Sequence, residues 1–305
     1  MDILNQIGNT PLIEFSGEVP NNNRIWLKLE YSNPFGSHYD RVYLKLFEHF
    51  VHEGFLTPGA TVLETTSGSA GVSFAAIGRL LGYKCQVAIP EGGEKAREEA
   101  IRAQGAELLF TPASDYVSGF PRFVKRYLVR NRDIVFLNHS TGPFGSENTV
   151  TTSALADIAI ELLEQIDTID YFVAAIGNGS SILGPGRILK GKSRIVTFEP
   201  FQSAVGYELL YPGRYESLYG ILPGILPRHQ LPGTSYQGID FPHIRLAFTD
   251  EQLVSETVLV SDRKMDEQYR DRTGEKLSET LPHWDAQSAD FGRSTRAGIA
   301  VALQK

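Results

Sequence analysis

Short apolar runs alternate with amphipathic segments along most of this chain. Runs rich in β-branched and aromatic residues predict strands at residues 25–30, 61–64, 83–89, 105–110, 134–138 and 170–176. Helical spacing of apolar residues marks the segments 42–47, 72–81, 94–104, 120–129 and 152–165. Strands that alternate with helices in this order predict an α/β fold with parallel sheets and right-handed crossovers.

Composition narrows the class of protein. The chain has 305 residues, enough for two lobes and a large core. Its formal net charge of −7 argues against a dedicated nucleic-acid binder. Cys85 is the one cysteine, which excludes an internal disulfide framework and fits a reducing, cytoplasmic setting. No signal peptide is evident at the start of the chain, and no apolar run approaches the roughly 20 residues that span a bilayer.

Two small-residue loops each join a predicted strand to a predicted helix. The first spans residues 65–71 and the second residues 177–181. Backbone N–H groups at a helix N-terminus attract anions, so both loops are candidate anion sites, although each could equally be a plain turn. The seven histidines show no His-x-x-x-His or His-Glu-x-x-His spacing, so no metal site is expected.

A third stretch, residues 33–41, reads Asn-Pro-Phe-Gly-Ser-His-Tyr-Asp-Arg between a predicted strand and a predicted helix. It begins with turn residues, Ser37 is a candidate N-cap, and Asp40 would lie near the positive end of the helix dipole. A strand that turns sharply into a helix is a common place to present one side chain to a ligand.

These stretches, with Ile-Gly-Asn-Thr-Pro-Leu at residues 7–12, resemble the cysteine synthase family of pyridoxal-phosphate (PLP) enzymes of fold type II. The family pattern at residues 33–41 is Asn-Pro-x-x-Ser-x-Lys-Asp-Arg. The resemblance implies a two-lobed, tryptophan synthase β-like fold of mostly parallel sheets flanked by helices. It assigns 1–43 and 149–305 to the larger lobe and 44–148 to the smaller lobe.

The resemblance also implies site residues. The substrate carboxylate would lie against the first loop, at Thr66, Ser67, Gly68, Ser69 and Gly71. The phosphate would lie against the second loop, at Gly177, Asn178, Gly179, Ser180 and Ser181. Gly220, a candidate substrate-binding residue, lies in a segment that crosses the cofactor face in the family. Two serines are candidate cofactor-binding residues: Ser294 occupies the place of a serine that meets the pyridine nitrogen, and Ser69 the place of an asparagine that reaches the cofactor's phenolic oxygen. The chain departs from the family pattern at Ser69, Ala70, Asn178, Ser180 and Arg296.

The main departure is Tyr39, which stands where the family has its Schiff-base lysine. A phenol cannot form an imine, and with a reference pKa of about 10 it is a poor base at neutral pH. Lys28 and Lys45 are the nearest lysines in sequence, and neither is expected to take over. His38 either faces away from Tyr39 or pairs with it as an acid/base couple. We favour the first interpretation because neighbouring side chains at a helix start diverge.

Three classes of function follow. The first is a homologue without the PLP lysine that binds a small anionic or amino-acid-derived ligand and regulates or assists a partner. The second is an enzyme whose cleft performs PLP-independent chemistry with Tyr39 as acid or base. The third is a PLP lyase or β-replacement enzyme that holds PLP non-covalently or carries an engineered Tyr39. The changes at several cofactor positions favour a rebuilt site over a single engineered substitution, and the family resemblance implies a homodimer.

Overall fold

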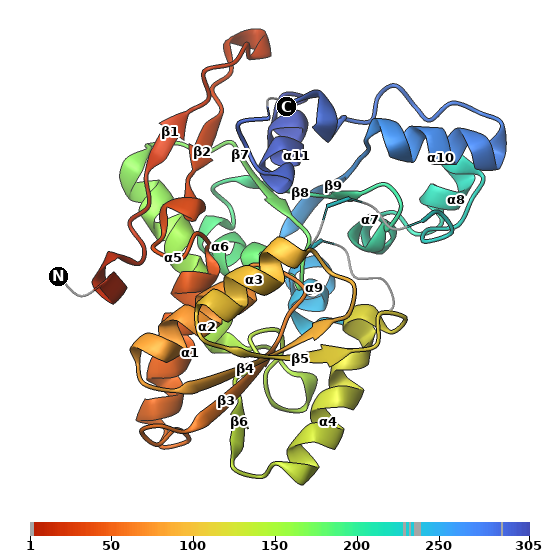
Figure 1. The fold of residues 1–305 in the computed structure, drawn as a ribbon. Helices are drawn as coiled ribbons and strands as arrows, with labels where there is room; N and C mark the ends of the chain where they lie inside the picture. Colours follow the sequence, from red (N-terminus) through yellow and green to blue (C-terminus); the bar gives the residue numbers. More distant parts are fainter. Residues whose placement is uncertain (1–2, 228–229, 232, 235–238, 288) are drawn as a thin grey trace. The chain divides into compact units, whose positions relative to one another are not determined.

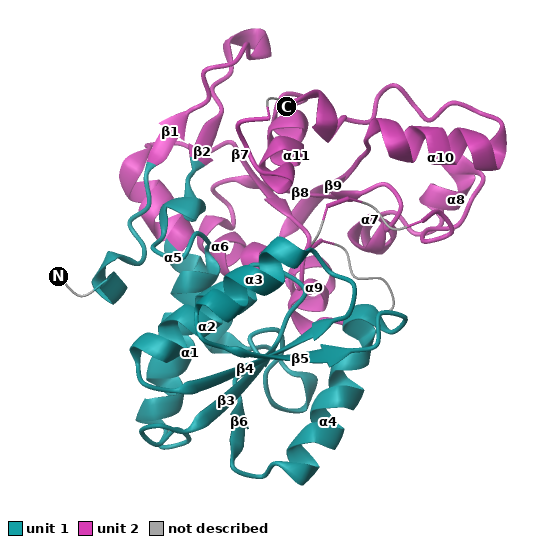
Figure 2. Cartoon of the chain, in the orientation of Figure 1, with its two compact units in different colours: residues 1–11, 28–157 teal, residues 12–27, 158–305 magenta. Residues whose placement is uncertain are grey.

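The computed structural model describes residues 3–227, 230–231, 233–234, 239–287 and 289–305. The chain divides into two compact units, shown in Figure 2: unit 1 comprises residues 1–11 and 28–157, and unit 2 comprises residues 12–27 and 158–305. Residues 1–11, 28–43 and 149–157 therefore lie in unit 1, whereas the family-based division counts them with the larger lobe. That division into lobes stays a prediction.

Unit 1 contains a four-stranded parallel sheet in the order β5-β4-β3-β6 (Figure 1). Its strands are β3 (Thr61–Thr65), β4 (Lys84–Pro90), β5 (Glu107–Thr111) and β6 (Ile134–Phe136). All four were predicted from the apolar runs. β6 ends two residues before the predicted boundary, because the chain turns at Asn138, where φ is 52°.

The helices of unit 1 are α1 (Tyr39–His52), α2 (Ala70–Leu80), α3 (Lys95–Ala103) and α4 (Phe120–Arg130). Helix α1 is amphipathic and buries Tyr43, Leu46 and Phe47 completely. Helix α2 approaches the sheet closely at Gly78, where an added Cβ would lie within van der Waals overlap of the Cys85 sulfur. Glycine is therefore needed for this helix to pack.

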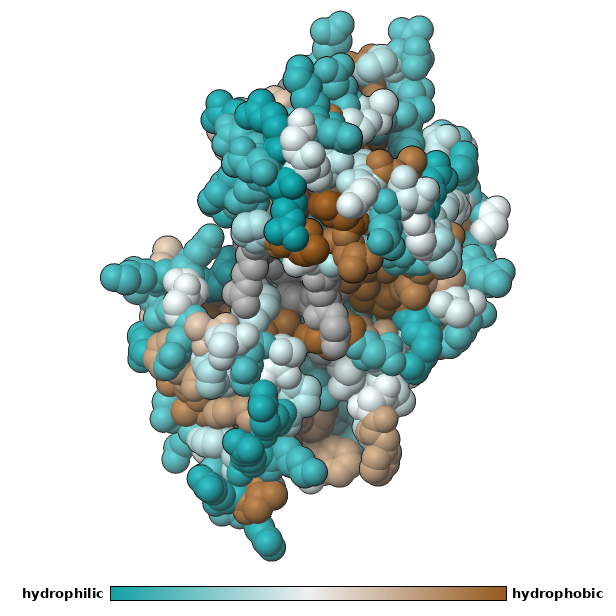
Figure 3. All heavy atoms as spheres, turned by 90° about the vertical axis from the view of Figure 1, so that its right-hand side faces the viewer, coloured by the Kyte–Doolittle hydropathy of each residue, from teal (hydrophilic) through white to brown (hydrophobic). Residues whose placement is uncertain are grey.

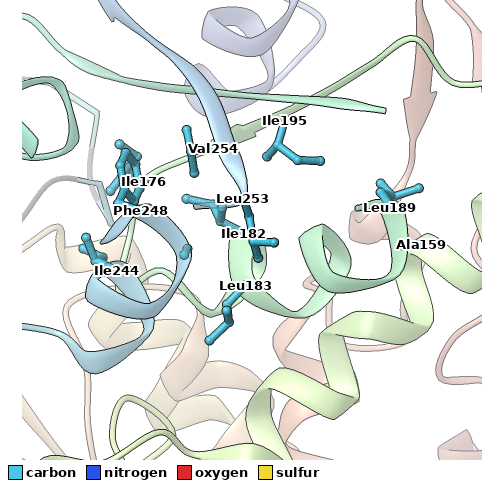
Figure 4. Packing of buried hydrophobic residues seen from close by; sticks show 11 residues of the cluster. Ala159, Ile176, Ile182, Leu183, Leu189, Ile195, Ile244, Phe248, Leu253 and Val254 are labelled. Carbon is cyan, nitrogen blue, oxygen red and sulfur yellow. The ribbon is translucent and has the colours of Figure 1, made fainter. Parts of the chain in front are cut away.

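Unit 2 contains a three-stranded parallel sheet in the order β7-β8-β9, built from β7 (Tyr171–Ala175), β8 (Arg194–Pro200) and β9 (Val254–Val260). Figure 4 shows the apolar core beside it, where Ile182 and Leu183 of one helix lie near Ile244 and Phe248 of another segment. The helices are α6 (Ser180–Leu189), α7 (Val205–Leu210), α8 (Arg214–Tyr219), α9 (Pro242–Arg245), α10 (Arg263–Thr273) and α11 (Arg293–Ala302).

The remaining elements are short or connect the units. Helix α5 (Thr149–Gln165) carries the chain from unit 1 into unit 2, and β1 (Leu12–Glu14) pairs with β2 (Trp26–Lys28). One-turn 3-10 segments lie at Ile3–Gln6, Pro20–Asn22, Glu30–Ser32, Tyr116–Gly119, Pro143–Gly145 and Trp284–Ala286, and a π-helical turn lies at Leu246–Asp250.

The face shown in Figure 3 is mostly hydrophilic, with hydrophobic side chains gathered in places. In unit 2 the exposed large hydrophobic residues include Leu209, Leu218, Leu222 and Ile225. Among the described residues, no helix combines the length and the apolar character that crossing a bilayer requires.

Candidate functional site

The turn before α1 is fixed by its own polar residues. The Arg41 guanidinium pairs with the Glu30 carboxylate through two contacts of 2.8 Å, and both side chains are largely buried. The Asn33 side chain accepts a backbone N–H from the opening loop at 2.9 Å and donates to the Glu30 carbonyl at 2.9 Å. Ser37 accepts the Tyr39 N–H at 3.2 Å, but the N-cap position of α1 is His38 and carries no side-chain cap bond. The prediction of Ser37 as the N-cap is therefore wrong, because the helix begins one residue later than expected. These residues have structural roles.

Asp40 links this turn to α2. Its carboxylate accepts the Phe35 N–H at 2.7 Å and the Ser73 hydroxyl at 2.5 Å. The side chain is completely buried, and this burial raises the pKa of Asp40 to about 6, against the lowering effect of those two hydrogen bonds. The predicted acidic residue in the first turn is therefore present, but its carboxylate turns away from the helix axis to hold the preceding loop.

Tyr39 lies among aromatic rings at the start of α1. Its ring centroid is 4.3 Å from that of His38, so the expectation that these two side chains diverge is wrong. The His139 ring meets Tyr39 edge-on at 5.3 Å. Burial raises the pKa of Tyr39 to about 12, with a further contribution from the Glu64 carboxylate, and burial lowers the pKa of His38 to about 4. At neutral pH the phenol is therefore protonated and the His38 imidazole is neutral.

A buried polar cluster lies beside Tyr39. Glu64 belongs to β3, and His139 follows the neighbouring strand β6, so both side chains lie at the carboxyl end of the same sheet. The His139 Nδ1 atom is 3.3 Å from the Glu64 Oε2 atom and 3.0 Å from the Tyr43 hydroxyl, and its Nε2 atom is 3.2 Å from the Ser140 hydroxyl. Glu64 also accepts the backbone N–H groups of Thr65 and His139, at 2.7 and 3.1 Å.

No motif in the sequence marks Glu64, Tyr43, His139 or Ser140 as site residues. A carboxylate in the otherwise apolar run at 61–64 was the one available signal, because a buried charge needs partners. Those partners come from α1 and from the segment after β6, which lies 75 residues further along the chain. Sequence spacing alone does not bring them together.

The first small-residue loop joins β3 to α2, as predicted. Thr66 is buried, and its hydroxyl accepts the Gly68 N–H at 2.9 Å. An added Cβ at Gly71 would lie 2.8 Å from side-chain atoms of Ile101 and Thr66, so a larger residue here would force these side chains to shift. Ser69 is exposed and occupies the N-cap position without a side-chain cap bond. Ser67 is half-buried in the same loop, with its carbonyl held by Arg97 at 2.7 Å.

The two nearest lysines are engaged elsewhere. The Lys28 ammonium group donates to the Thr10 carbonyl at 2.6 Å. The Lys45 ammonium group pairs with the Asp157 carboxylate at 2.7 Å, on a partly exposed side of α1. That neither lysine replaces the one that the family pattern places at Tyr39 stays a prediction.

The second small-residue loop, in unit 2, joins β7 to α6. The Asn178 side-chain oxygen accepts the Ser180 N–H at 3.0 Å and the Ser180 hydroxyl at 2.6 Å. Gly179 has φ of 92°, and a Cβ there would lie 2.6 Å from the Ile244 backbone nitrogen. Asn178 and Ser180 are both buried, and Ser181 is half-buried. The loop therefore satisfies part of its own anion-binding potential with a carboxamide oxygen.

The remaining predicted residues also lie in unit 2. Ser294 is exposed in the first turn of α11. Arg296 donates to the Asp285 carbonyl at 3.0 Å, and its guanidinium lies 5.3 Å from the centre of the Trp284 ring. Gly220 ends α8 with φ of 64°. The binding roles assigned to the residues of both loops, to Ser294 and to Gly220 stay predictions.

A search of the described residues for a metal centre finds no group of three His, Cys, Asp or Glu side chains that could hold an ion.

Comparison with solved structures supports the fold. A hydrogen sulfide-producing enzyme of Fusobacterium nucleatum superposes with a TM-score of 0.77, at 24% identity over 99% of this chain and 91% of that chain. A cysteine synthase of Entamoeba histolytica superposes with a TM-score of 0.72, at 27% identity over 99% of this chain and 81% of that chain. The predicted α/β architecture of a fold type II PLP enzyme is confirmed.

Sequence comparison reaches the same group of proteins. Residues 3–270 match the family described as "Pyridoxal-phosphate dependent enzyme". A curated cysteine synthase of Staphylococcus aureus is 34% identical over 230 residues, which cover 72% of this chain and 71% of the relative. One from Aquifex aeolicus is 31% identical over 216 residues, covering 69% and 63%. This chain belongs to the family of pyridoxal-phosphate dependent enzymes and is similar to its cysteine synthases.

Proposed function

We propose that this chain is a cysteine-synthase-like protein that binds a small, carboxylate-bearing ligand derived from an amino acid and does not hold PLP as an imine. The observation that carries the proposal is the packing of Tyr39. Its ring lies edge-on to His139 at 5.3 Å and against His38 at 4.3 Å, at the position where the family pattern has its lysine.

The residues at hand do not fit PLP held in the family's manner. An imine needs a primary amine, which Tyr39 lacks, and the ammonium groups of Lys28 and Lys45 are engaged in contacts of 2.6 and 2.7 Å. In the loop at 177–181, the Asn178 oxygen occupies the Ser180 N–H that an incoming phosphate would need. The proposed function therefore includes no chemical step through PLP.

The loop at 65–71 supports carboxylate binding. Helix α2 has 11 residues and its N-terminus carries no side-chain cap, so the helix dipole favours an anion before its first turn. The N–H groups of Gly71 and Val72 donate to the Gly68 and Ser69 carbonyls, so the carboxylate would lie against the preceding residues, Ser69 and Ala70. The hydroxyls of Ser69 and Ser37, 3.4 Å apart, add two polar groups beside this turn. If the ligand carboxylate binds at this turn, the amino group and side chain of the ligand remain available for contacts with neighbouring residues.

The first experiment separates this proposal from a covalent PLP enzyme. The purified protein is incubated with PLP, passed through a desalting column and treated with borohydride. We expect no imine absorbance band and no PLP fixed by reduction. A reducible band in the native chain would overturn the proposal and favour the alternative of a PLP lyase or β-replacement enzyme.

A second variant tests the pocket. Tyr39→Lys restores the amine that the family pattern places there, and Tyr31→Lys is a matched control because Tyr31 is an exposed tyrosine, 59% accessible, in the same segment. A band that appears only in Tyr39→Lys would place the family's lysine position at residue 39. A band in both variants would mean that any added surface lysine reacts.

The ligand itself is sought by titration calorimetry with L-serine and O-acetyl-L-serine, the second because some structural neighbours are described as acting with O-acetylserine. Saturable binding of these amino acids supports the proposal if it requires their carboxylate. The control compound is serinol, which lacks the carboxylate and should not bind. A regulatory or partner-binding role, a homodimer and a cytoplasmic location are further parts of this proposal, and light scattering with and without ligand addresses the oligomer.

A further inference from the structure

The cluster around His139 has the connectivity of a nucleophile, a base and an orienting carboxylate. The Ser140 hydroxyl is 3.2 Å from His139 Nε2, and His139 Nδ1 is 3.3 Å from the Glu64 carboxylate. Glu64 is completely buried and His139 is 5% exposed, whereas Ser140 is half-buried. The base and the carboxylate are thus shielded from water, whereas Ser140 keeps part of its surface exposed.

The surrounding contacts select the tautomer that a base requires. Burial raises the pKa of Tyr43 well above its usual value, so its hydroxyl keeps its proton, and the Glu64 side chain is a hydrogen-bond partner of that hydroxyl. With the Tyr43 proton directed to Glu64, the Tyr43 oxygen accepts the proton of His139 Nδ1 at 3.0 Å, so Glu64 positions the imidazole through Tyr43. The Nε2 atom then has a lone pair that accepts the Ser140 hydroxyl.

The backbone presents this pair on a sharp turn. Strand β6 ends at Phe136, and Asn138 adopts φ of 52°, a left-handed conformation that asparagine tolerates better than most residues. Asn138 is held by its amide contact to the Thr141 hydroxyl at 2.7 Å and by Asn148, which donates to its carbonyl at 2.9 Å. Unusual backbone held by side-chain contacts is frequent where a strand end presents a reactive group.

We propose that Ser140, His139 and Glu64 act as nucleophile, general base and positioning carboxylate in the hydrolysis of a small carboxylate-bearing ester. We assign the reaction to acyl transfer because a serine hydroxyl activated by a histidine base attacks a carbonyl carbon. The requirement for a carboxylate on the substrate rests on the proposed function of the loop at 65–71. The activity itself requires neither a lysine nor a cofactor.

The reaction balances with water as the one co-substrate. The Ser140 oxygen forms a bond to the acyl carbon while His139 Nε2 takes its proton, and the bond from the acyl carbon to the alkoxy oxygen breaks. His139 returns the proton to that leaving oxygen, which departs as the alcohol. Water then attacks the acyl-serine with His139 again as base, and release of the carboxylic acid restores the Ser140 hydroxyl.

The test measures acetate released from O-acetyl-L-serine by the full-length protein at neutral pH, relative to buffer alone. We expect release above the buffer rate, and a loss of at least about 100-fold in both Ser140→Ala and His139→Gln, since neither group works without the other. The matched control is Ser146→Ala. Ser146 is an exposed serine in the following loop whose hydroxyl donates to the Pro143 carbonyl, and its replacement should leave the rate unchanged.

A second readout is independent of turnover. A fluorophosphonate probe should label the peptide that contains Ser140, and labelling should disappear in Ser140→Ala and fall sharply in His139→Gln, with melting temperatures showing that both variants are folded. Release at the buffer rate, or equal rates in native and Ser140→Ala protein, overturns the inference. Calorimetric binding of L-serine that persists in that case would leave the proposed function standing, so the two failures are distinguishable.

Discussion

Replacing Asp40 by asparagine should change how stability depends on pH. The carboxyl group is completely buried, and burial raises its pKa to about 6, compared with 3.8 for the unperturbed group. Because the folded protein binds this proton more tightly than the unfolded chain, the stabilising effect of protonation is complete below about pH 4. It is lost as pH rises through about 6.

The magnitude follows from the difference of about 2 pKa units. At about 1.4 kcal/mol per unit, ionisation of the native Asp40 costs about 3 kcal/mol once pH exceeds both values. At pH 4.5 only about 1 kcal/mol of this cost has developed, because the unfolded chain has just begun to ionise. Asp40→Asn keeps an oxygen for the Phe35 N–H and carries no charge. Its stability relative to the native protein should therefore improve by about 2 kcal/mol between pH 4.5 and pH 7.5.

The assay is urea unfolding of both proteins at these two pH values, with Asp157→Asn as control. Asp157 is 40% exposed and pairs with Lys45, so its replacement should give a difference that changes by less than about 1 kcal/mol with pH. If the Asp40→Asn difference is flat, or if the native protein gains at high pH, the reasoning is refuted. The hydrogen bonds from Phe35 and Ser73 would then outweigh burial.

Three further predictions concern packing and burial. Gly179→Ala should cost about 2–4 kcal/mol in urea unfolding because its φ is 92° and a Cβ would strike the α9 backbone, whereas Gly191→Ala, with φ of 76° in open space, should cost about 1 kcal/mol. Tyr43→Phe should cost about 1–3 kcal/mol because it leaves buried partners of the hydroxyl unpaired, while Tyr31→Phe should be neutral in the same assay. Cys85 should resist alkylation by iodoacetamide until the protein unfolds, because burial raises its thiol pKa to about 12; rapid labelling of folded protein would contradict this.

The order of strands and helices was accessible from the sequence because periodicity is a local property. The run at 61–64 became β3, and the helix predicted at 120–129 was found at Phe120–Arg130. The fold type came from a resemblance spread over most of the chain. Its confirmation by comparison shows that motif order carries more information than any one loop.

The arrangement of the site was less accessible, since it depends on contacts between distant segments. Nothing local in the sequence pairs Glu64 with a residue 75 positions further on. The orientation of His38 also escaped prediction, because the helix begins one residue later and the two rings lie side by side at 4.3 Å. Tertiary packing decided both, and the roles of the two loops stay predictions.

The asparagine oxygen that holds the first turn of α6 has a consequence for biogenesis. In a protein whose helix start is completed by a bound anion, the apo form is less stable and cellular supply of the ligand controls how much folded protein accumulates. Here Asn178 provides that acceptor within the chain, at 3.0 Å from the Ser180 nitrogen. The first turn of α6 can therefore form during folding without a bound anion. Vitamin B6 starvation should accordingly leave the abundance of this protein unchanged.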